Sequence, residues 1–483
     1  MHFSKIKTVH FIGIGGIGTS TIARMFLLEG KKVSGSDMAE SEVTLELRKA
    51  GVQIFLKEDA KNIPADCELV IYTIAISKDH AELVEAKKRG IPILSYPEAL
   101  GIISRDKYTI AITGTHGKTT TTAMVAKIMM DAGLDPTVII GSFFLDGQSP
   151  LSKGALHSDA GGLFESELTT PSLADSGTPF IKGDKAIGRT NFVAGKSKYL
   201  VVEGCEYRRS FLNLSPGVLV ITNIDTDHLD YYRDMQDIVS AFVELARKIP
   251  KDGFLILDSH APNLEAVVKN TPCKHGDFAV LKLPEGFKMH IPGAHNILNA
   301  KAALAVAKVL GIPEAQALKS LSEFRGTWRR FEYRGKAKND ALVYDDYGHH
   351  PTEIEATLQG TRELFPLNKG GSSGGLSPTQ KIVVVFQPHL YSRTKQHLHG
   401  FGSAFKEASS VILLPIYPAR EIDHGDINSQ MVVDELKKNG KDAHLVATFS
   451  DAAVFAEKLS SADDIILTLG AGETNRVADI LAQ

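Results

Sequence analysis

Hydrophobic and polar positions follow two alternating patterns along the first hundred residues. Short apolar runs such as "TVHFIGIG" and "ELVIYTIAI" have the length of buried strands, whereas "TSTIARMFLLEGK" has the apolar spacing of a helix and ends at Gly30. Strand-like and helix-like segments then follow one another as far as residue 107. This alternation predicts βαβ units, and therefore a parallel sheet with helices on its faces.

The same order of elements begins again further along the chain. A strand-like run, "KYTIAITG", opens near residue 107 and leads through a glycine turn into the helix-like "TTTTAMVAKIMMDAG". In the last third, "KIVVVFQ", "SVILLPIY", "MVVDELKKNG" and "DDIILTLGAG" alternate in the same way. We therefore expect an α/β protein with three domains, at residues 1–107, 108–327 and 328–483.

Two stretches interrupt the pattern. Residues 145–188 are rich in Gly, Ser, Thr, Asp and Pro and show no period, which predicts a long surface insertion within the middle domain. A second Gly- and Ser-rich loop, "NKGGSSGGLSPT", precedes the strand "KIVVVFQ".

Composition narrows the class of protein. Of 483 residues, 43% are hydrophobic and 23% are charged, and the formal net charge is −3, which argues against nucleic acid or an anionic membrane as a partner. We find neither the apolar run of a signal peptide nor one long enough to cross a membrane. The three cysteines form no CxxC pair, which favours a reducing, cytoplasmic location. A monomer and a homodimer are equally compatible with the sequence.

The first glycine turn has the spacing of a dinucleotide-binding motif. Gly13-x-Gly15-x-x-Gly18 follows the first strand and opens the first helix, where backbone N–H groups can face a pyrophosphate. Asp37 ends the next strand, a place where an acid commonly meets a ribose hydroxyl. By itself this turn would suit an NAD-dependent oxidoreductase as well as a protein that binds a nucleotide sugar.

A second glycine loop, "TGTHGKTTTT", carries the stronger chemical signal. Its glycines and the helix that follows present backbone N–H groups to an anion, and Lys118 adds a mobile charge for the β and γ phosphates. Thr119 or Thr120 offers a hydroxyl to Mg²⁺. Gly114 lies only two residues before Gly117, so the loop is a shortened variant of the usual phosphate loop.

Seven motifs in a fixed order carry a resemblance to a known family. They are "TGTHGKTTTTA", "EGCEYRRSFL", "TNIDTDHLDYY", "GAHNILNA", "RGTWRRFE", "YDDYGHHPTE" and "FQPHLYSRT". In order and residue type the chain resembles the Mur ligases, ATP-dependent amide ligases that build the peptide of bacterial peptidoglycan. The resemblance implies a Rossmann-like UDP-sugar domain, a phosphate-loop ATP domain and an α/β C-terminal ligase domain. It also implies an acyl-phosphate intermediate, with ATP converted to ADP and phosphate.

Within the family, "DDYGHHPTE" together with "FQPHLYSRT" favours the subgroup that adds L-alanine to UDP-N-acetylmuramate. The ligases that recycle murein tripeptide remain the alternative from the same family. An NAD-dependent oxidoreductase and a non-catalytic UDP-sugar sensor are the alternatives from other classes. The phosphate loop argues against the first of these, and the presence of the catalytic residues argues against the second.

The resemblance also implies roles for individual residues. The UDP-sugar would lie on Gly15, Gly16, Ile17, Gly18, Ser36 and Asp37. ATP would contact Gly114, Thr115, His116, Gly117, Lys118, Thr119, Thr120, Asn296, Asn299, Arg330 and Asp346. Mg²⁺ would be held by Thr119, Glu203 and His228. The amino acid and its acceptor would face Tyr347, His349, His350, His389 and Arg393. The residues expected to act directly in catalysis are Lys118, Glu203, His228, Arg330 and Asp346.

Two positions depart from the pattern of many relatives. "DIVSAFVELA" lacks the lysine that many Mur ligases carbamoylate to hold a second metal ion, and Leu390 stands where many have an arginine. Asn296 and Asn299 share one helix face and suit an adenine edge, although without the resemblance a helix cap followed by a solvated face would be the preferred explanation.

Overall fold

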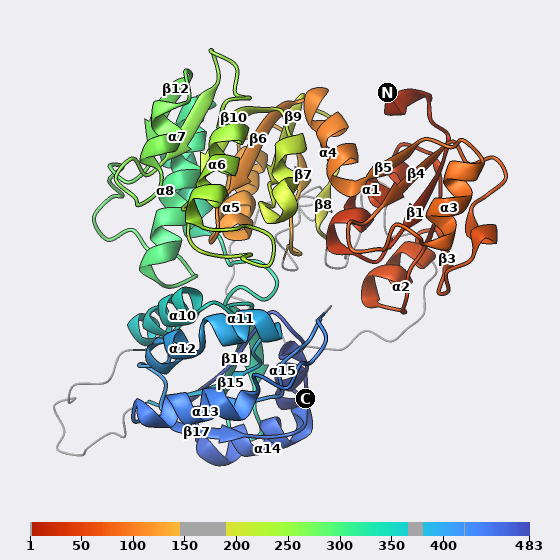
Figure 1. Ribbon diagram of the computed structural model, residues 1–483. Coiled ribbons are helices and arrows are strands. Elements are labelled where there is room, and N and C mark those ends of the chain that lie inside the picture. Colours follow the sequence, from red (N-terminus) through yellow and green to blue (C-terminus); the bar gives the residue numbers. More distant parts are fainter. Residues whose placement is uncertain (1, 145–189, 366–379, 420) are drawn as a thin grey trace, which may run out of the picture.

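The computed structural model describes residues 2–144, 190–365, 380–419 and 421–483. The predicted insertion at 145–188 and the loop "NKGGSSGGLSPT" lie outside these residues. The described chain forms three β-sheets, each flanked by helices, which follow one another along the sequence (Figure 1). We call them the N-terminal, middle and C-terminal sheets.

The N-terminal sheet is parallel, with strand order β3-β2-β1-β4-β5. Every residue of its central strand β1 is buried. Its strands are β1 (Thr8–Ile12), β2 (Lys32–Ser36), β3 (Gln53–Phe55), β4 (Leu69–Tyr72) and β5 (Ile93–Ser95). Its helices are α1 (Ile17–Leu28), α2 (Glu42–Lys49), α3 (Ala81–Lys88) and α4 (Tyr96–Arg105). The first glycine turn connects β1 to α1.

The middle sheet has the order β12-β11-β10-β6-β9-β7-β8, and only the short β8 runs antiparallel to its neighbour. Its strands are β6 (Tyr108–Thr113), β7 (Thr137–Ile139), β8 (Phe192–Val193), β9 (Tyr199–Glu203), β10 (Pro216–Ile221), β11 (Phe254–Leu257) and β12 (Lys274–Asp277). Its helices are α5 (Lys118–Asp131), α6 (Met235–Ala246), α7 (Glu265–Lys269), α8 (Ala294–Val309) and α9 (Glu314–Ser322). The second glycine loop connects β6 to α5.

The C-terminal sheet has the order β13-β14-β18-β15-β16-β17, in which the edge strand β13 is antiparallel. Its strands are β13 (Glu332–Lys336), β14 (Leu342–Asp346), β15 (Ile382–Phe386), β16 (Ser410–Leu413), β17 (Asp442–Leu445) and β18 (Ile465–Leu469). Its helices are α10 (Pro351–Leu364), α11 (Tyr391–Gln396), α12 (Leu398–Ala404), α13 (Ser429–Lys438), α14 (Phe449–Leu459) and α15 (Asn475–Leu481).

The predicted α/β fold class is confirmed, and the turn residues explain several element ends. Helix α1 stops at Leu28, after which Gly30 takes the left-handed conformation that glycine adopts at low cost. Helix α8 ends in the same way before Gly311. The sequence did not predict β8 or β13, because a two-residue strand and a largely exposed edge strand carry little apolar pattern.

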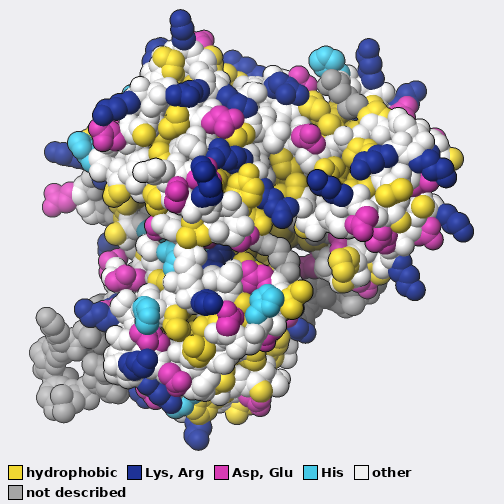
Figure 2. Space-filling view, viewed as in Figure 1, with side chains coloured by type: hydrophobic (Ala, Val, Ile, Leu, Met, Phe, Trp, Pro, Cys, Tyr) yellow, Lys and Arg dark blue, Asp and Glu magenta, His cyan; other side chains and the backbone are white. Residues whose placement is uncertain are grey.

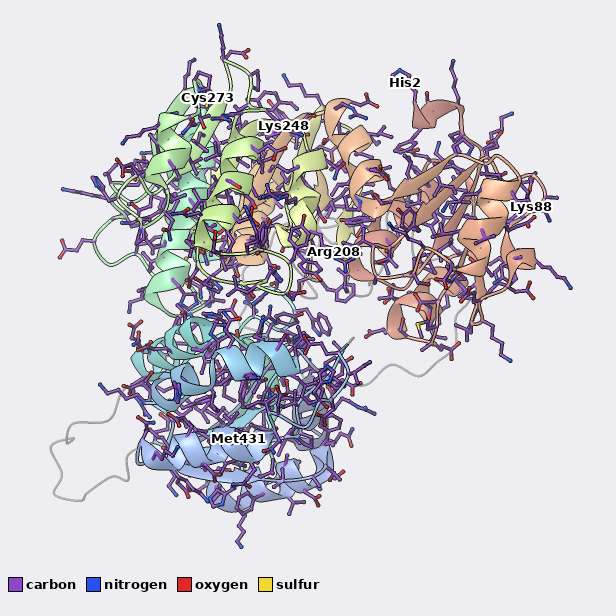
Figure 3. All side chains as sticks on the ribbon, viewed as in Figure 1. His2, Lys88, Arg208, Lys248, Cys273 and Met431 are labelled. Carbon is purple, nitrogen blue, oxygen red and sulfur yellow. The ribbon has the colours of Figure 1, made fainter. Side chains whose placement is uncertain are left out.

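Polar contacts join the N-terminal and middle parts. Asn191, just before β8, donates from Nδ2 to the Ile17 carbonyl and accepts from Arg24 at 2.6 Å. Arg208, labelled in Figure 3, donates to the Ile74 carbonyl of the N-terminal part at 3.0 Å. On the face shown in Figure 2, positive and negative side chains are interspersed. No described helix is long and apolar enough to span a bilayer.

Candidate functional site

The loops that follow parallel strands meet around the phosphate loop. Gly117 is the N-cap of α5 and has φ 81°, and a Cβ there would lie 2.4 Å from Asn299 Oδ1. A Cβ on Gly114 would lie 2.1 Å from Thr222 Oγ1. Both glycines are therefore required by the strand end and the helix packed against them, and the loop leaves the first backbone N–H groups of α5 open to an anion.

Lys118 folds back onto its own loop. Its ammonium donates to the Gly114 and Thr115 carbonyls at 2.6 and 2.9 Å and to Glu206 Oε1 at 3.0 Å. Burial opposes the charge of Lys118, but Glu206 and the neighbouring groups raise its pKa above the ordinary value. Lys118 must therefore leave Glu206 before it can reach a phosphate.

A carboxylate and a hydroxyl beside the loop suit a hard cation. Glu203 ends β9, and its two oxygens accept from Thr119 Oγ1 at 2.9 Å and from the Gly141 N–H at 2.7 Å. Glu206 is buried, and its Oε2 has no hydrogen-bond partner among the described residues. Because Mg²⁺ prefers oxygen ligands, these donors fit the ion that the sequence implied.

The imidazole of His228 lies close to the carboxylates of Glu206 and Asp227. Its Nε2 is 3.7 Å from Glu206 Oε1 and 3.7 Å from Asp227 Oδ2. Burial lowers the pKa of His228, which favours the neutral imidazole with a free lone pair. Its φ of 57° is uncommon for a non-glycine residue and turns the chain sharply after Asp227.

Among the described residues, two cavities share Gly117 and Thr119, and the larger, about 490 Å³, lies beside the phosphate loop between the middle and C-terminal parts. Asn296 and Asn299 line it and are bonded to each other at 3.2 Å, which confirms that the two amides share one helix face. Asp346 lies in the wall, and burial raises its pKa to about 6. Of the predicted ATP-contacting residues, those lining this cavity are His116, Gly117, Thr119, Thr120, Asn296, Asn299, Arg330 and Asp346.

The smaller cavity, about 330 Å³, gathers most of the residues predicted for catalysis and the amino acid. Those are Lys118, Glu203, His228, Arg330, Tyr347, His349, His389 and Arg393. Both cavities include Gly117, Thr119, Arg330 and Glu353 in their walls. Arg330 stacks over the Tyr347 ring at 4.8 Å. The two cavities therefore meet at the start of α5, where a phosphate bound to the loop would be accessible from both.

Arg393 forms an ion pair across the junction of the middle and C-terminal parts. Its Nη2 donates to Asp227 Oδ1 at 2.8 Å, and its Nη1 lies 3.3 Å from His389 Nδ1. Burial disfavours the Asp227 carboxylate, but Arg393, His228 and His349 hold its pKa well below the usual range. Burial lowers the pKa of His349 to about 3.

The structure places His350 outside both cavities. It is the N-cap of α10, and its Nδ1 accepts from the Thr352 N–H at 3.3 Å. Its ring lies 5.0 Å from that of His116 and 4.4 Å from that of His397. A contact of His350 with substrate stays a prediction.

Of the residues predicted to contact the UDP-sugar, Ile17 lines the smaller cavity and the others line neither cavity. The Gly15 N–H donates to Asp37 Oδ2 at 2.7 Å, and the Ser36 carbonyl accepts from the Gly13 N–H. A Cβ on Gly18 would lie 2.6 Å from the Tyr96 ring, so that glycine is required by packing. Asp37 therefore braces the turn.

Sequence reasoning missed three carboxylates of the site. Glu206, Asp227 and Glu353 each pair with a predicted residue, namely Lys118, Arg393 and His116. All three stand inside quoted motifs, one to three residues from a predicted member. An acid next to a catalytic residue in a motif is therefore the signal that could have found them.

Comparison with known proteins agrees with these features. Three family models match, the Mur ligase family catalytic domain at residues 8–108, the Mur ligase middle domain at 112–283 and the Mur ligase glutamate ligase domain at 329–472. Curated UDP-N-acetylmuramate–L-alanine ligases of Clostridium kluyveri and Caldicellulosiruptor bescii are 36% and 38% identical, covering 99% and 98% of this chain and 98% and 97% of their own lengths.

Two solved structures are similar along their whole length. The UDP-N-acetylmuramate–alanine ligase of Thermotoga maritima has a TM-score of 0.73 and 29% identity, covering 99% of this chain and 98% of its own. A murein peptide ligase from Psychrobacter arcticus has a TM-score of 0.67 at 22% identity, covering 99% of each chain, and shows a shared fold. These matches and the phosphate-loop site show that this chain belongs to the Mur ligase family.

Proposed function

We propose that this protein is an ATP-dependent ligase that joins L-alanine to UDP-N-acetylmuramate and releases ADP and phosphate, in the synthesis of the peptidoglycan precursor. The observation that carries the proposal is the meeting of two cavities at Gly117, Thr119, Arg330 and Glu353. One cavity suits the nucleotide, and the other suits the carboxylate and the amine. The 36% and 38% identity to L-alanine ligases, over nearly the full length of this chain, supports this choice of substrates.

The reaction uses the junction as the place of phosphoryl transfer. A carboxylate oxygen of the muramate forms a bond to the γ-phosphorus of ATP, the bond to the β-γ bridging oxygen breaks, and ADP leaves. The alanine nitrogen then attacks the acyl carbon, loses its proton, and phosphate leaves with the former carboxylate oxygen. Lys118 and Arg330 provide positive charge around the transferring group. Thr119, Glu203 and His228 would hold Mg²⁺, which would supply further positive charge to the phosphates.

The Arg393–Asp227 pair matches a free amino acid in charge. A zwitterion carries one carboxylate and one ammonium close together, and the two ends of this ion pair offer the opposite charges at 2.8 Å. We infer that the carboxylate of alanine takes the guanidinium of Arg393 bidentately, and that Asp227 accepts from its ammonium. Leu390 lines the same cavity and would limit the room for the side chain of the amino acid.

We further propose that the three sheets are the three domains of the sequence prediction, residues 1–107, 108–327 and 328–483. The first turn then holds the diphosphate of the UDP-sugar at the N-terminus of α1, on the N–H groups that Asp37 does not occupy. Asn296 and Asn299 form hydrogen bonds with the adenine edge, and Asp346 faces the nucleotide.

Phosphate release in the presence of ATP, Mg²⁺ and UDP-N-acetylmuramate tests the proposal against a panel of amines. We expect L-alanine to give the highest kcat/KM, above glycine and L-serine, and the murein tripeptide to give little release. A preference for the tripeptide would instead establish the recycling reaction. Release that needs no UDP-N-acetylmuramate would exclude both.

A further inference from the structure

A cluster of two histidines and an aspartate lies at the junction of the middle and C-terminal parts. His116 belongs to the phosphate loop, Asp225 to the loop after β10, and His350 to the N-cap of α10. One ligand atom from each of the three side chains lies within 4.8 Å of the other two. None of the three is among the residues expected to hold Mg²⁺.

His116 lies between two carboxylates, an arrangement that a metal-binding histidine also has. Its Nε2 lies 3.3 Å from Asp225 Oδ2, close to the separation of about 3.3–3.4 Å between two ligands of a tetrahedral ion with bonds of about 2.0–2.1 Å. On the other side of the ring, Nδ1 lies 3.1 Å from Glu353 Oε1. Metal-bound histidines commonly donate their second N–H to a carboxylate, which fixes the tautomer and turns the free lone pair toward the ion.

His350 provides a second, independent indication. The side chain is 6% exposed, and its buried Nε2 has no hydrogen-bond partner among the described residues. A buried nitrogen without a hydrogen-bond partner destabilises the folded state, and coordination to an ion would remove that cost. Binding through Nε2 requires the tautomer with the proton on Nδ1, so the long bond from the Thr352 N–H would be lost.

We propose that His116, Asp225 and His350 form a binding site for a divalent transition-metal ion of the Zn²⁺ and Co²⁺ class, with Glu353 as the carboxylate that orients His116. Two imidazoles and one carboxylate favour such an ion over Mg²⁺, which prefers oxygen ligands. The ion ties the phosphate loop to α10, and therefore holds the middle and C-terminal parts together. This metal site goes beyond the ligase reaction, and the proposal of the site does not depend on the proposed function.

Titration of the full-length, ligand-free and Mg²⁺-free protein with Co²⁺ tests the proposal, because tetrahedral Co²⁺ gives visible absorption bands. We expect saturable bands with one Co²⁺ per chain. Asp225→Asn and His350→Gln should each weaken Co²⁺ binding by about tenfold or more. His295→Gln, a matched histidine in the wall of the larger cavity, should bind as the wild type does.

Glu203→Gln distinguishes this site from the expected Mg²⁺ site and should keep the bands. Absence of saturable bands would overturn the proposal and leave a proton on Nε2 of His116, between two carboxylates. Bands that survive Asp225→Asn and His350→Gln but disappear in Glu203→Gln would also overturn it. Circular dichroism and thermal melting check that each variant folds, and if Asp225→Asn does not fold, His350→Gln decides the outcome.

Discussion

Lys118 and Glu206 show how a single residue can be held away from its task. The ammonium is bonded to Glu206 and to two carbonyls of its own loop, so the ligand-free loop is closed on itself. A triphosphate carries more negative charge than Glu206 and can therefore replace it as the partner of Lys118. The carboxylate of Glu206, whose Oε2 has no hydrogen-bond partner among the described residues, is then available to a cation. Nucleotide binding therefore exchanges one set of ionic contacts for another.

Lys118→Ala is expected to lower kcat by about 100-fold or more, since a positioned charge on the transferring phosphoryl group is worth roughly 3–4 kcal/mol. Steady-state phosphate release at saturating ATP measures the effect. Lys127→Ala is the matched control, because Lys127 lies on the same helix, pairs with Asp131 at 2.8 Å and lines neither cavity, so this variant should keep most of the turnover. A Lys118→Ala variant with near wild-type kcat would remove Lys118 from phosphoryl transfer.

Arg393→Lys should raise KM for L-alanine about tenfold to a hundredfold, because a charge-assisted pair is worth roughly 1.5–3 kcal/mol and lysine cannot pair bidentately. KM for ATP should barely change. Arg476→Lys, a surface arginine of the same part, serves as the control. If KM for L-alanine is unchanged in both Arg393→Lys and Arg393→Ala, the carboxylate must bind elsewhere, with His349, His350 and His389 as the remaining candidates.

His295 makes stability depend on pH in a defined direction. Burial lowers its pKa to about 4, below the ordinary 6.5, so the folded state favours the neutral ring. Its contribution to stability is fully present above about pH 6.5 and is lost as the pH falls toward 4. Between pH 7 and pH 5, the melting temperature of His295→Gln should fall less than that of the wild type, and an equal fall in both would contradict this role.

At the scale of elements, the turn between β1 and α1 is the feature that the sequence predicted most directly. The structure explains its glycines individually. A Cβ on Gly15 or Gly18 would clash with Asp37 or Tyr96. A Cβ on Gly16 would first contact the flexible Thr19 hydroxyl, at 3.1 Å. Gly16 is also the N-cap of α1 and has an extended conformation that any residue adopts. Gly16 is therefore the position that tests ligand approach without disturbing the turn.

Gly16→Ala should raise KM for UDP-N-acetylmuramate by about tenfold, the cost of roughly one charge-assisted backbone contact, and leave KM for ATP unchanged. Gly276→Ala in β12 is the control, because a Cβ there makes only ordinary contact with Ile256. An equal change in both KM values would show that the turn supports the whole protein and not the sugar nucleotide. Tight NAD binding by calorimetry, lost in Gly16→Ala, would revive the oxidoreductase alternative.

For the whole molecule, the sequence pattern predicted those strands and loops whose structure depends on residues close together in the chain. Apolar runs marked β1, β6 and β15, and glycines marked the loops after β1 and β6, because each depends on neighbouring residues. The site's ion pairs were not predicted, because they join residues far apart in sequence. Lys118 and Glu206 are 88 positions apart, Asp227 and Arg393 are 166, and His116 and Glu353 are 237. The first pair forms within the folded middle part, and the other two form only once the middle and C-terminal parts have packed together.

The transfer of an oxygen isotope tests the central claim most directly. UDP-N-acetylmuramate labelled with ¹⁸O in its carboxylate is incubated with the protein, ATP, Mg²⁺ and L-alanine, and the products are examined by mass spectrometry. The account predicts that one ¹⁸O atom moves from the carboxylate to each inorganic phosphate as the L-alanyl product forms. Phosphate without ¹⁸O, or amide formation with ATP cleaved to AMP, would contradict an acyl phosphate formed where the two cavities meet.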